Sequence, residues 1–253
     1  MKQNYFDFII CGAGASGLLL LKAIREDSFF NEKSILIIEK EIKNVNDRTW
    51  SYWESPNGSF DSILSKKWSK ANFCSEDFDS DFDLNPYQYK MLRSAGFYQS
   101  IRNKYSKLKN TIFLHAEVKN IDSKNIMTEV ITSEGKFQSK KVFNSLFDPK
   151  PMINQKKYPV LQQHFVGWFI KTKKPSFDSS KVFFMDFNIP QVQETRFIYV
   201  LPIDKHNALL EYTLFSENLL HFDDYETGIK AYLDSKGIIE YEIKEKEQGN
   251  IPM

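Results

Sequence analysis

The first forty residues show two apolar runs separated by a helical pattern. Residues 6–11 form an apolar run that is typical of a parallel strand buried on both faces. A glycine-rich turn follows, and then apolar positions at helical spacing over residues 15–26. A second apolar run over residues 34–38 ends at Glu39. A strand, helix and strand of this length have the size of a right-handed crossover unit, so the N-terminal part predicts a parallel α/β fold.

The middle of the chain is mixed at first and then becomes helical in pattern. Residues 47–83 are turn-rich and contain an acidic run, which we interpret as a solvated loop. From Pro86, apolar residues recur at steps of three and four as far as Leu108, so we expect a helix with Pro86 in its first turn. The basic residues of this expected helix are Lys90, Arg93, Arg102, Lys104, Lys107 and Lys109.

Beyond this helix the period changes to two, which predicts a series of strands. The expected strands are residues 112–118, 127–132, 136–143, 162–171, 182–189, 196–202 and 208–215. A helix over residues 223–236 should end at Gly237 in the left-handed conformation. The predicted fold class is therefore α/β, with a Rossmann-like domain over residues 1–158 and an antiparallel sheet domain over residues 159–253.

Composition and charge exclude several classes of function. The 253 residues carry 34 Lys and Arg against 33 Asp and Glu, so no overall field attracts nucleic acid. Cys11 and Cys74 are too few for a disulfide framework, and the four histidines share no ligand spacing, so we expect no metal site. No G-x-S-x-G motif occurs and neither cysteine has a base nearby in sequence, which leaves nucleophilic hydrolysis without support.

The sequence has no signal for a membrane span or for secretion. No stretch of 18 apolar residues occurs, and no basic segment leads into a cleavable apolar region. We expect a reduced, intracellular protein that is soluble or peripherally bound. The expected basic helix has three interpretations that remain open: contact with anionic lipid headgroups, a solvated face, or alignment with the phosphates of a nucleotide cofactor.

A glycine pattern at the first turn predicts a dinucleotide site. Residues 12–17, GAGASG, fit the pattern G-x-G-x-x-G directly after a predicted strand and at the start of a predicted helix. Gly12 permits the tight turn, Gly14 lets a pyrophosphate approach the backbone, and Gly17 lets the helix pack on the strand. Glu39, at the end of the second strand, is placed to bind ribose hydroxyls, which favours FAD or NAD over NADP. The antiparallel sheet that follows favours FAD, because a nicotinamide dehydrogenase would continue with further βα repeats.

Two carboxylates lie on predicted strands among apolar neighbours. Alternation along residues 208–215 surrounds Glu211 with apolar side chains and leaves it without an obvious local cation. Desolvation would raise the pKa of Glu211 and keep a proton available for general acid catalysis. Spacing alone leaves open a solvent-facing Glu211 on an edge strand, or one paired with Arg196 or Lys205. Asp186 lies in a predicted strand rich in aromatic residues. It either has a structural role, as a capping residue or a member of an ion pair, or it tunes the acidity of Glu211.

The aromatic content is unusually high. The chain has 22 Phe, 12 Tyr and 4 Trp, which make up 15% of its residues. Most of the rings along the predicted sheet are expected in the core. Rings that face a cavity would bind a long apolar ligand and stabilise a carbocation by cation–π attraction, about 1–2 kcal/mol per ring when desolvated.

Taken together, these motifs resemble the lycopene cyclase family, specifically the bacterial β-cyclases. Residues 7–18 look like the family's opening D-x4-G-x-G-x-x-G-L. The further matching segments, in order, are Arg48-Thr49-Trp50, Gln163-His164-Phe165, Gly167-Trp168, Met185-Asp186-Phe187, Phe197 with Tyr199-Val200-Leu201-Pro202, and Gly249-Asn250-Ile251-Pro252-Met253. Residues 210–213, LEYT, resemble the segment that bears the family's catalytic glutamate, which corresponds to Glu211.

The resemblance implies a flavoprotein with the fold of FAD-dependent hydroxylases. Its substrate would be lycopene or a related linear carotenoid, cyclised without net redox change to β-ionone rings. It would use reduced FAD, with NADPH or NADH as electron donor, and would act in the cytoplasm at the periphery of the inner membrane. The expected catalytic residues are Glu211 and Asp186, and the expected cofactor contacts are Gly12, Gly14, Gly17, Glu39, Arg48 and Val118.

In the mechanism that the resemblance implies, Glu211 protonates the terminal C1=C2 double bond of the substrate. The C5=C6 double bond then attacks the cation, and loss of a proton from C6 closes the β-ring. The negative charge of reduced flavin would stabilise the cation electrostatically.

Two departures from the family pattern are expected to matter. Residues 144–146, NSL, stand where the family shows Asp-Ser-Arg at a flavin contact. The family pattern also continues beyond residue 253 with a second FAD-contacting segment, so we expect a C-terminally truncated chain. The alternative functions are an FAD-dependent monooxygenase or reductase of the same fold, and a catalytically silent flavin- or lipid-binding fragment.

Overall fold

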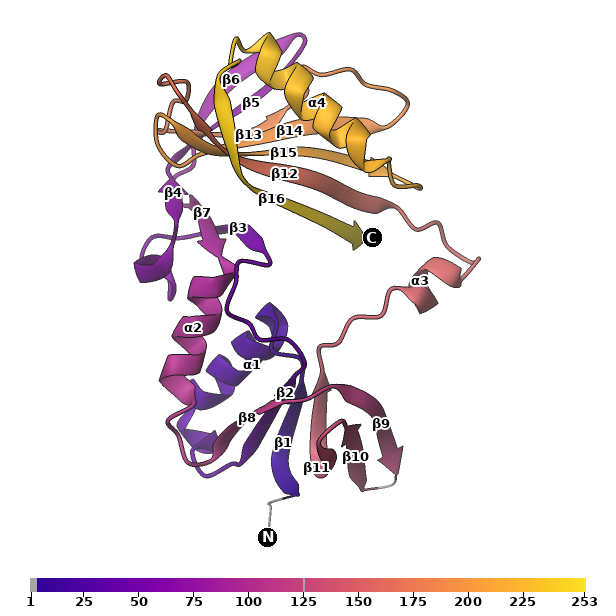
Figure 1. Ribbon diagram of the computed structural model, residues 1–253. Coiled ribbons are helices and arrows are strands. Elements are labelled where there is room, and N and C mark those ends of the chain that lie inside the picture. The colour runs from indigo at the N-terminus through magenta and orange to yellow at the C-terminus, as the bar shows by residue number, and fades with distance from the viewer. Residues whose placement is uncertain (1–3, 125) are drawn as a thin grey trace. The chain divides into compact units, whose positions relative to one another are not determined.

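The computed structural model describes residues 4–124 and 126–253 (Figure 1). The chain forms two compact units, and each is built from two separate stretches of sequence. Unit 1 consists of Met1–Asn46 and Ser94–Asp148, and unit 2 of Asp47–Arg93 and Pro149–Met253. The sequence predicted one boundary at residue 158. The division differs because residues 47–93 fold into strands that belong to unit 2.

Unit 1 is a parallel α/β unit with an antiparallel extension. Its six-stranded sheet has the order β8-β2-β1-β11-β10-β9. The strands are β1 (Tyr5–Cys11), β2 (Ile35–Glu39), β8 (Thr111–His115), β9 (Val118–Lys124), β10 (Met127–Thr132) and β11 (Gly135–Asn144), and the helices are α1 (Ala15–Glu26), the 3₁₀ helix η1 (Ser28–Phe30) and α2 (Ser94–Tyr105). β1 pairs in parallel with β2 and β11, and β2 pairs in parallel with β8. The predicted crossover from β1 through α1 to β2 is confirmed.

Unit 2 contains a seven-stranded sheet with the order β16-β12-β15-β14-β13-β5-β6 and a three-stranded sheet with the order β3-β7-β4. The larger sheet consists of β5 (Lys70–Ser75), β6 (Phe78–Asp83), β12 (Gln162–Thr172), β13 (Val182–Asp186), β14 (Thr195–Pro202), β15 (Asn207–Ser216) and β16 (Tyr241–Pro252). The smaller sheet consists of β3 (Thr49–Glu54), β4 (Lys66–Trp68) and β7 (Gln88–Arg93), and the helices of unit 2 are η2 (Asp61–Ile63), α3 (Lys150–Asn154) and α4 (Phe222–Ser235).

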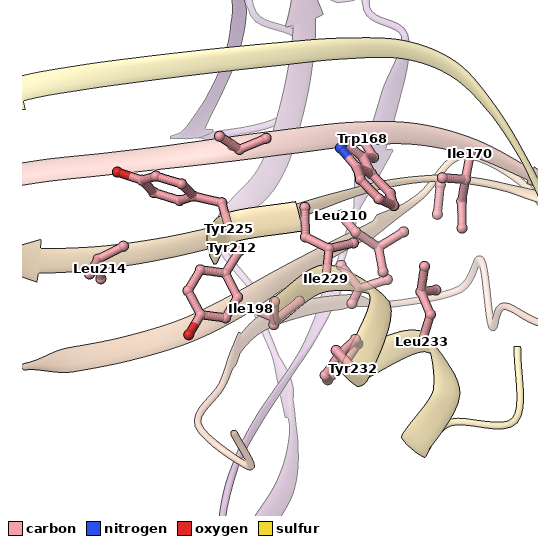
Figure 2. Packing of buried hydrophobic residues seen from close by; sticks show 13 residues of the cluster. Trp168, Ile170, Ile198, Leu210, Tyr212, Leu214, Tyr225, Ile229, Tyr232 and Leu233 are labelled. Carbon is pink, nitrogen blue, oxygen red and sulfur yellow. The ribbon is translucent and has the colours of Figure 1, made fainter. Parts of the chain in front are cut away.

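The two faces of the larger sheet are covered by different elements. α4 packs on one face, where Leu210 and Trp168 of the sheet are buried with Ile229 and Leu233 of the helix (Figure 2). Successive side chains of a strand point to opposite faces. Leu209, the neighbour of Leu210, therefore belongs to a second core, on the face away from α4.

The second core joins the larger sheet to the smaller one. Leu209 and Phe169 of the larger sheet pack there with Trp68 of β4 and with Tyr89 and Met91 of β7. The buried face of β7 thus depends on long-range contacts with the larger sheet.

These contacts explain why the helix expected from Pro86 to Leu108 is wrong in its first half. Residues 88–93 form strand β7 between β3 and β4, and the helix α2 begins only at Ser94. Pairing with two strands satisfies the backbone of β7, and packing of Tyr89 and Met91 overrides the local helical spacing.

The basic residues assigned to that helix are also distributed differently. Lys90 is fully buried, and its Nζ donates to Glu54 Oε2 at 2.9 Å and to Asp61 Oδ1 at 2.5 Å. Arg93 belongs to unit 2 and pairs with Glu245, while Lys104 in α2 pairs with Glu26. The expected continuous basic helix face is therefore wrong.

Further elements differ from the prediction, which did not expect the strands β3, β4, β5 and β9. The acidic run expected as a loop forms a turn and the edge strand β6, where Asp79 and Asp81 accept hydrogen bonds from Asn72 and Asp81 also pairs with Lys181. The strand β16 was not expected, because its sequence is strongly polar. The strands β10, β12, β14 and β15 and the helix α4, with Gly237 at φ +70°, agree with the prediction.

Gly228 and Gly96 test the packing of α4 with a matched pair of substitutions. A Cβ atom on Gly228 would lie 2.3 Å from the buried ring of Tyr212, whereas one on Gly96 in α2 would meet nothing within 4 Å. Gly228→Ala should lower the free energy of unfolding by about 1–3 kcal/mol through overpacking. Gly96→Ala should raise it by up to about 1 kcal/mol, because alanine favours the helix. Urea denaturation followed by circular dichroism measures both, and equal effects of the two substitutions would contradict the packing described.

Candidate active site

The glycine turn between β1 and α1 has the geometry expected of a dinucleotide fingerprint. Gly12 has φ +100°, a conformation that favours glycine. A Cβ on Gly17 would lie 2.1 Å from the Gly12 carbonyl oxygen, so only glycine allows the helix this close to the strand. A Cβ on Gly14 would meet nothing within 4 Å, and Gly14 caps α1 without a side-chain hydrogen bond. The turn therefore leaves open space at the N-terminus of α1, where backbone N–H groups favour an anion.

Glu39 and Val118 lie near this turn in unit 1. Glu39 ends β2, and its Oε2 accepts a hydrogen bond from the Ala13 N–H at 2.7 Å. The Glu39 carbonyl accepts from the Ala116 N–H at 3.0 Å, two residues before half-buried Val118 begins β9. A hollow of about 370 Å³ adjoins Glu39, and Arg102 contributes to its lining. These residues occupy the carboxyl end of the parallel strands, where ligands of α/β folds bind.

Ser145 explains how the divergent segment at residues 144–146 is accommodated. The Ser145 N–H and Oγ both donate to the Cys11 carbonyl at 2.9 Å, and Oγ also lies 3.1 Å from the Gly12 carbonyl oxygen. The serine shared with the family pattern thus ties the end of β11 to the glycine turn. Asn144 Oδ1 accepts from the Leu146 N–H at 3.0 Å, which fixes the backbone locally.

Arg48 lies in unit 2, unlike the other expected cofactor contacts. Its Nη1 donates to the Asp47 carbonyl at 2.6 Å. The residue lines a hollow of about 350 Å³ together with His164, Phe165 and Asn250. Three of the segments that resemble the lycopene cyclase pattern, those at residues 48–50, 163–165 and 249–253, therefore meet at this hollow.

Glu211 lies in the interior of the larger sheet, on the face away from α4. β15 is flanked by β12 and β14, so the edge-strand interpretation is wrong. Arg196 pairs with Glu194 instead, at 2.8 Å, and among the contacts of the described residues neither Arg196 nor Lys205 pairs with Glu211. Four residues on adjacent strands lie in register: Glu247 on β16, Gly167 on β12, Glu211 on β15 and Tyr199 on β14. The row brings a second carboxyl, from β16, to the same face as Glu211.

The two carboxyl groups meet above Gly167. A Cβ at this position would lie 3.0 Å from Glu211 Cγ and 3.1 Å from Glu247 Cγ, so the glycine gives both side chains room. Glu211 is half-buried when the whole residue is considered, but its carboxyl group is buried. Burial of the carboxyl is the largest cause that raises the pKa of Glu211 well above its usual value. The negative charge of Glu247 and a hydrogen bond between the carboxyls raise this pKa further. The geometry therefore favours a protonated Glu211 near neutral pH.

Glu247 is the site residue that the sequence reasoning missed. Its Oε2 accepts a hydrogen bond from Thr49 Oγ1 at 2.7 Å. Thr49 belongs to the segment 48–50, and Glu247 stands two residues before the terminal segment 249–253 that carries the resemblance. That proximity was the available signal, but without a predicted strand β16 nothing placed Glu247 opposite Glu211.

Aromatic rings surround the carboxyl pair on the same face. Tyr199 lies opposite Glu211 on the neighbouring strand, and its ring centre is 4.9 Å from that of Phe197 and 5.6 Å from that of Phe184. Phe184 in turn contacts Tyr89 at 5.4 Å. Burial, followed by the charge of Glu211, raises the pKa of Tyr199 to about 12, so this phenol is neutral. Of the rings expected along the sheet, Trp168 belongs to the opposite, α4-facing core.

Asp186 is not brought together with Glu211. The pairing of β13 shifts register between Phe183 and Asp186, so that Asp186 faces α4 although Phe184 packs near Tyr199. Asp186 is fully buried and accepts from the Tyr232 hydroxyl at 2.8 Å and from Lys236 Nζ at 3.1 Å. Burial alone would raise the pKa of Asp186, but its hydrogen-bond donors together hold that pKa below the usual value. The suggested tuning of Glu211 by Asp186 is therefore replaced by a structural role against α4.

Residues 4–124 and 126–253 were searched for membrane-spanning helices and for metal-binding clusters. No helix in these ranges is long and apolar enough to cross a bilayer. Nor do they place three His, Cys, Asp or Glu side chains where they could hold a metal ion.

Solved structures similar to this chain share the predicted fold. A geranylgeranyl bacteriochlorophyll reductase-like protein from Thermoplasma acidophilum has a TM-score of 0.71 at 11% identity, covering 99% of this chain and 67% of its own. NikD, an amino acid oxidase of nikkomycin biosynthesis, has a TM-score of 0.70 at 8% identity, covering 99% and 82%. The halogenase PltM in complex with phloroglucinol and FAD has a TM-score of 0.66 at 11% identity, covering 97% and 59%. They confirm the Rossmann-like fold of FAD-dependent enzymes, and the chain spans about two thirds of the first structure's length.

The sequence comparisons agree with the resemblance found in the motifs. A search of curated proteins gives no match. The sequence model of the family described as lycopene cyclase protein matches residues 7–253, which is nearly the whole chain. The chain therefore belongs to the lycopene cyclase family.

Proposed function

We propose that the protein cyclises the ends of lycopene, or of a related linear carotenoid, to β-ionone rings. The observation that carries this proposal is the Glu211 carboxyl beside Glu247 on an aromatic sheet face, where burial raises the pKa of Glu211. Family membership supports the substrate class. A hydrocarbon offers no lone pair to protonate, so its activation needs an acid that keeps its proton in an apolar environment.

The proposed reaction moves one proton and consumes no electrons. The Glu211 carboxyl gives its proton to the terminal C1=C2 double bond, which leaves a carbocation at C1. The C5=C6 double bond attacks this cation and forms the C1–C6 bond, and loss of the C6 proton to the carboxylate restores Glu211. The rings of Tyr199 and Phe197 stabilise the cation by about 1–2 kcal/mol each. These rings also exclude water, which would otherwise trap the cation.

We further propose that the glycine turn of unit 1 holds FAD. The open space at Gly14 and the uncapped N-terminus of α1 fit a pyrophosphate, and Glu39 fits the ribose hydroxyls. Val118 is the further proposed contact in unit 1, and Arg48, in unit 2, stays a prediction. Reduced FAD, maintained by NADPH or NADH, would supply negative charge that favours a carbocation.

The substrate also determines the proposed location. A linear carotenoid dissolves in the hydrocarbon region of a bilayer, so the protein takes its substrate from a membrane surface. We propose peripheral association with the cytoplasmic face of the inner membrane.

Replacement of the acid tests the reaction. Glu211→Gln removes the transferable proton and keeps the side-chain shape, so cyclisation should fall at least 10²-fold. The measurement is conversion of red lycopene to orange products in cells that accumulate lycopene and express the full-length protein. Glu240→Gln, on an exposed glutamate paired with Lys173, should leave conversion unchanged. Full conversion by Glu211→Gln would remove Glu211 from the mechanism, and oxygen consumption with NADPH would favour a monooxygenase.

Replacement of Gly14 tests the cofactor site separately from folding. Its backbone angles, φ −76° and ψ −172°, suit any residue, and an added Cβ meets no atom within 4 Å. Gly14→Ala should therefore leave the free energy of unfolding within about 0.5 kcal/mol of the original, since no strain or clash arises. It should weaken FAD binding at least tenfold, because the methyl group occupies the space of the pyrophosphate. Flavin titration by fluorescence measures this, and unchanged FAD affinity would place the cofactor elsewhere.

A further inference from the structure

We propose that Glu247 is a positioning residue that keeps the proton of the carboxyl pair on Glu211, with Thr49 fixing which of the two carboxyls is ionised. The inference deepens the proposed function, because it concerns the proton that Glu211 donates. It rests on four features: the strand register, the glycine between the two acids, the hydrogen bond from Thr49, and the absence of a competing cation.

The register fixes the distance between the two acids. Gly167 in the central strand β12 pairs with Glu247 on one side and with Glu211 on the other. Side chains two strands apart would normally be separated by the side chain between them. Here the middle residue has none, and both Cγ atoms come to about 3 Å from where its Cβ would be. The sheet thus brings two carboxyls into contact across a gap that only glycine provides.

The hydrogen bond from Thr49 makes the pair asymmetric. Thr49 Oγ1 donates to Glu247 Oε2, so this oxygen already has a hydrogen-bond donor. Among the hydrogen bonds found for the described residues, no N–H or hydroxyl group donates to the carboxyl of Glu211, apart from the bond that it shares with Glu247. Glu247 Oε1 is buried and has no other donor, so a proton held by Glu211 satisfies it. A shared proton placed on Glu211 therefore gives both oxygens of Glu247 a donor, which favours Glu211 as the acid of the pair.

The charged groups around the pair preserve this arrangement. Arg93, from β7, stacks on Phe169 at 4.1 Å and pairs with Glu245, which precedes Glu247 by two residues on the same face of β16. Arg93 thus pairs with Glu245, and among the ion pairs of the described residues none joins a cation to Glu211. The phenols that face the pair, Tyr199 from β14 and Tyr89 from β7, are neutral because burial raises the pKa of both.

The pH dependence provides the test. The pKa of Glu211 is raised, so the acid is protonated below that value and activity is lost as the pH rises through it. Glu247→Gln removes a negative charge and offers an amide donor, and both changes favour ionised Glu211. The loss of activity should therefore begin about one pH unit or more lower. At acidic pH the variant should retain activity within a few fold, because Glu211 is protonated there in either protein.

A direct titration separates this inference from the proposed function. Purified full-length protein with ¹³C-labelled glutamate carboxyls is titrated by NMR without substrate, and Glu211→Gln assigns the Glu211 signal. The Glu211 midpoint should fall in Glu247→Gln and stay high in Glu247→Asp, which keeps the charge. Glu242→Gln, an exposed glutamate on the same strand, is the matched control and should not move it. Thr49→Val should transfer part of the proton to Glu247.

The outcomes are distinguishable. An unchanged Glu211 midpoint in Glu247→Gln overturns the inference, whatever the activity. So does a loss of activity that is equal at every pH, since that indicates a merely structural role. A shifted midpoint in a protein that does not cyclise lycopene supports the carboxyl pair and rejects the cyclase.

Discussion

The pKa of a glutamic acid rises where water and cations are kept away from its carboxyl group, and one face of the larger sheet meets this requirement. Glu211 is desolvated, its nearest charged neighbour is Glu247, and Arg93 is engaged by Glu245. Each condition raises the cost of ionising Glu211. A hydrocarbon substrate needs such an acid, because it can supply neither a basic group nor hydrogen bonds to orient the proton.

The same sheet contains a buried carboxyl of the opposite character. Asp186 faces α4 and receives hydrogen bonds from Tyr232 and from the Asn188 N–H, and Lys236 is 3.1 Å away. Those donors lower its pKa, whereas Glu211 has an acidic partner that raises its pKa. Burial is common to both residues, so the partners decide which acid is ionised. The pKa of the buried acid is therefore lowered on the α4 face of the sheet and raised on the opposite face.

In unit 1, glycines meet three different demands within six residues. Gly12 adopts a left-handed backbone, Gly17 allows close packing of α1, and Gly14 alone leaves free space. The fold therefore requires the first two glycines, whereas the space at Gly14 is the part of the turn proposed to receive a ligand. Ser145 reinforces the turn from a distant strand, which explains how the divergent residues beside it are tolerated.

Local sequence pattern was sufficient for the elements whose character is set by neighbouring residues. The crossover at residues 5–39, the alternating strands β12, β14 and β15, and the glycine turn follow from periodicity and backbone chemistry. Glu211 was singled out on its apolar strand, but only the resemblance of residues 210–213 identified it as the acid. Strand β7 was misread as a helix, since its contacts with β3, β4 and Trp68 come from far along the chain. Only the tertiary structure placed Glu247 beside Glu211 and Asp186 on the other face. The reason is physical: the partners of a carboxyl are set by strand register and by a β-bulge, and neither is encoded by residues next to it.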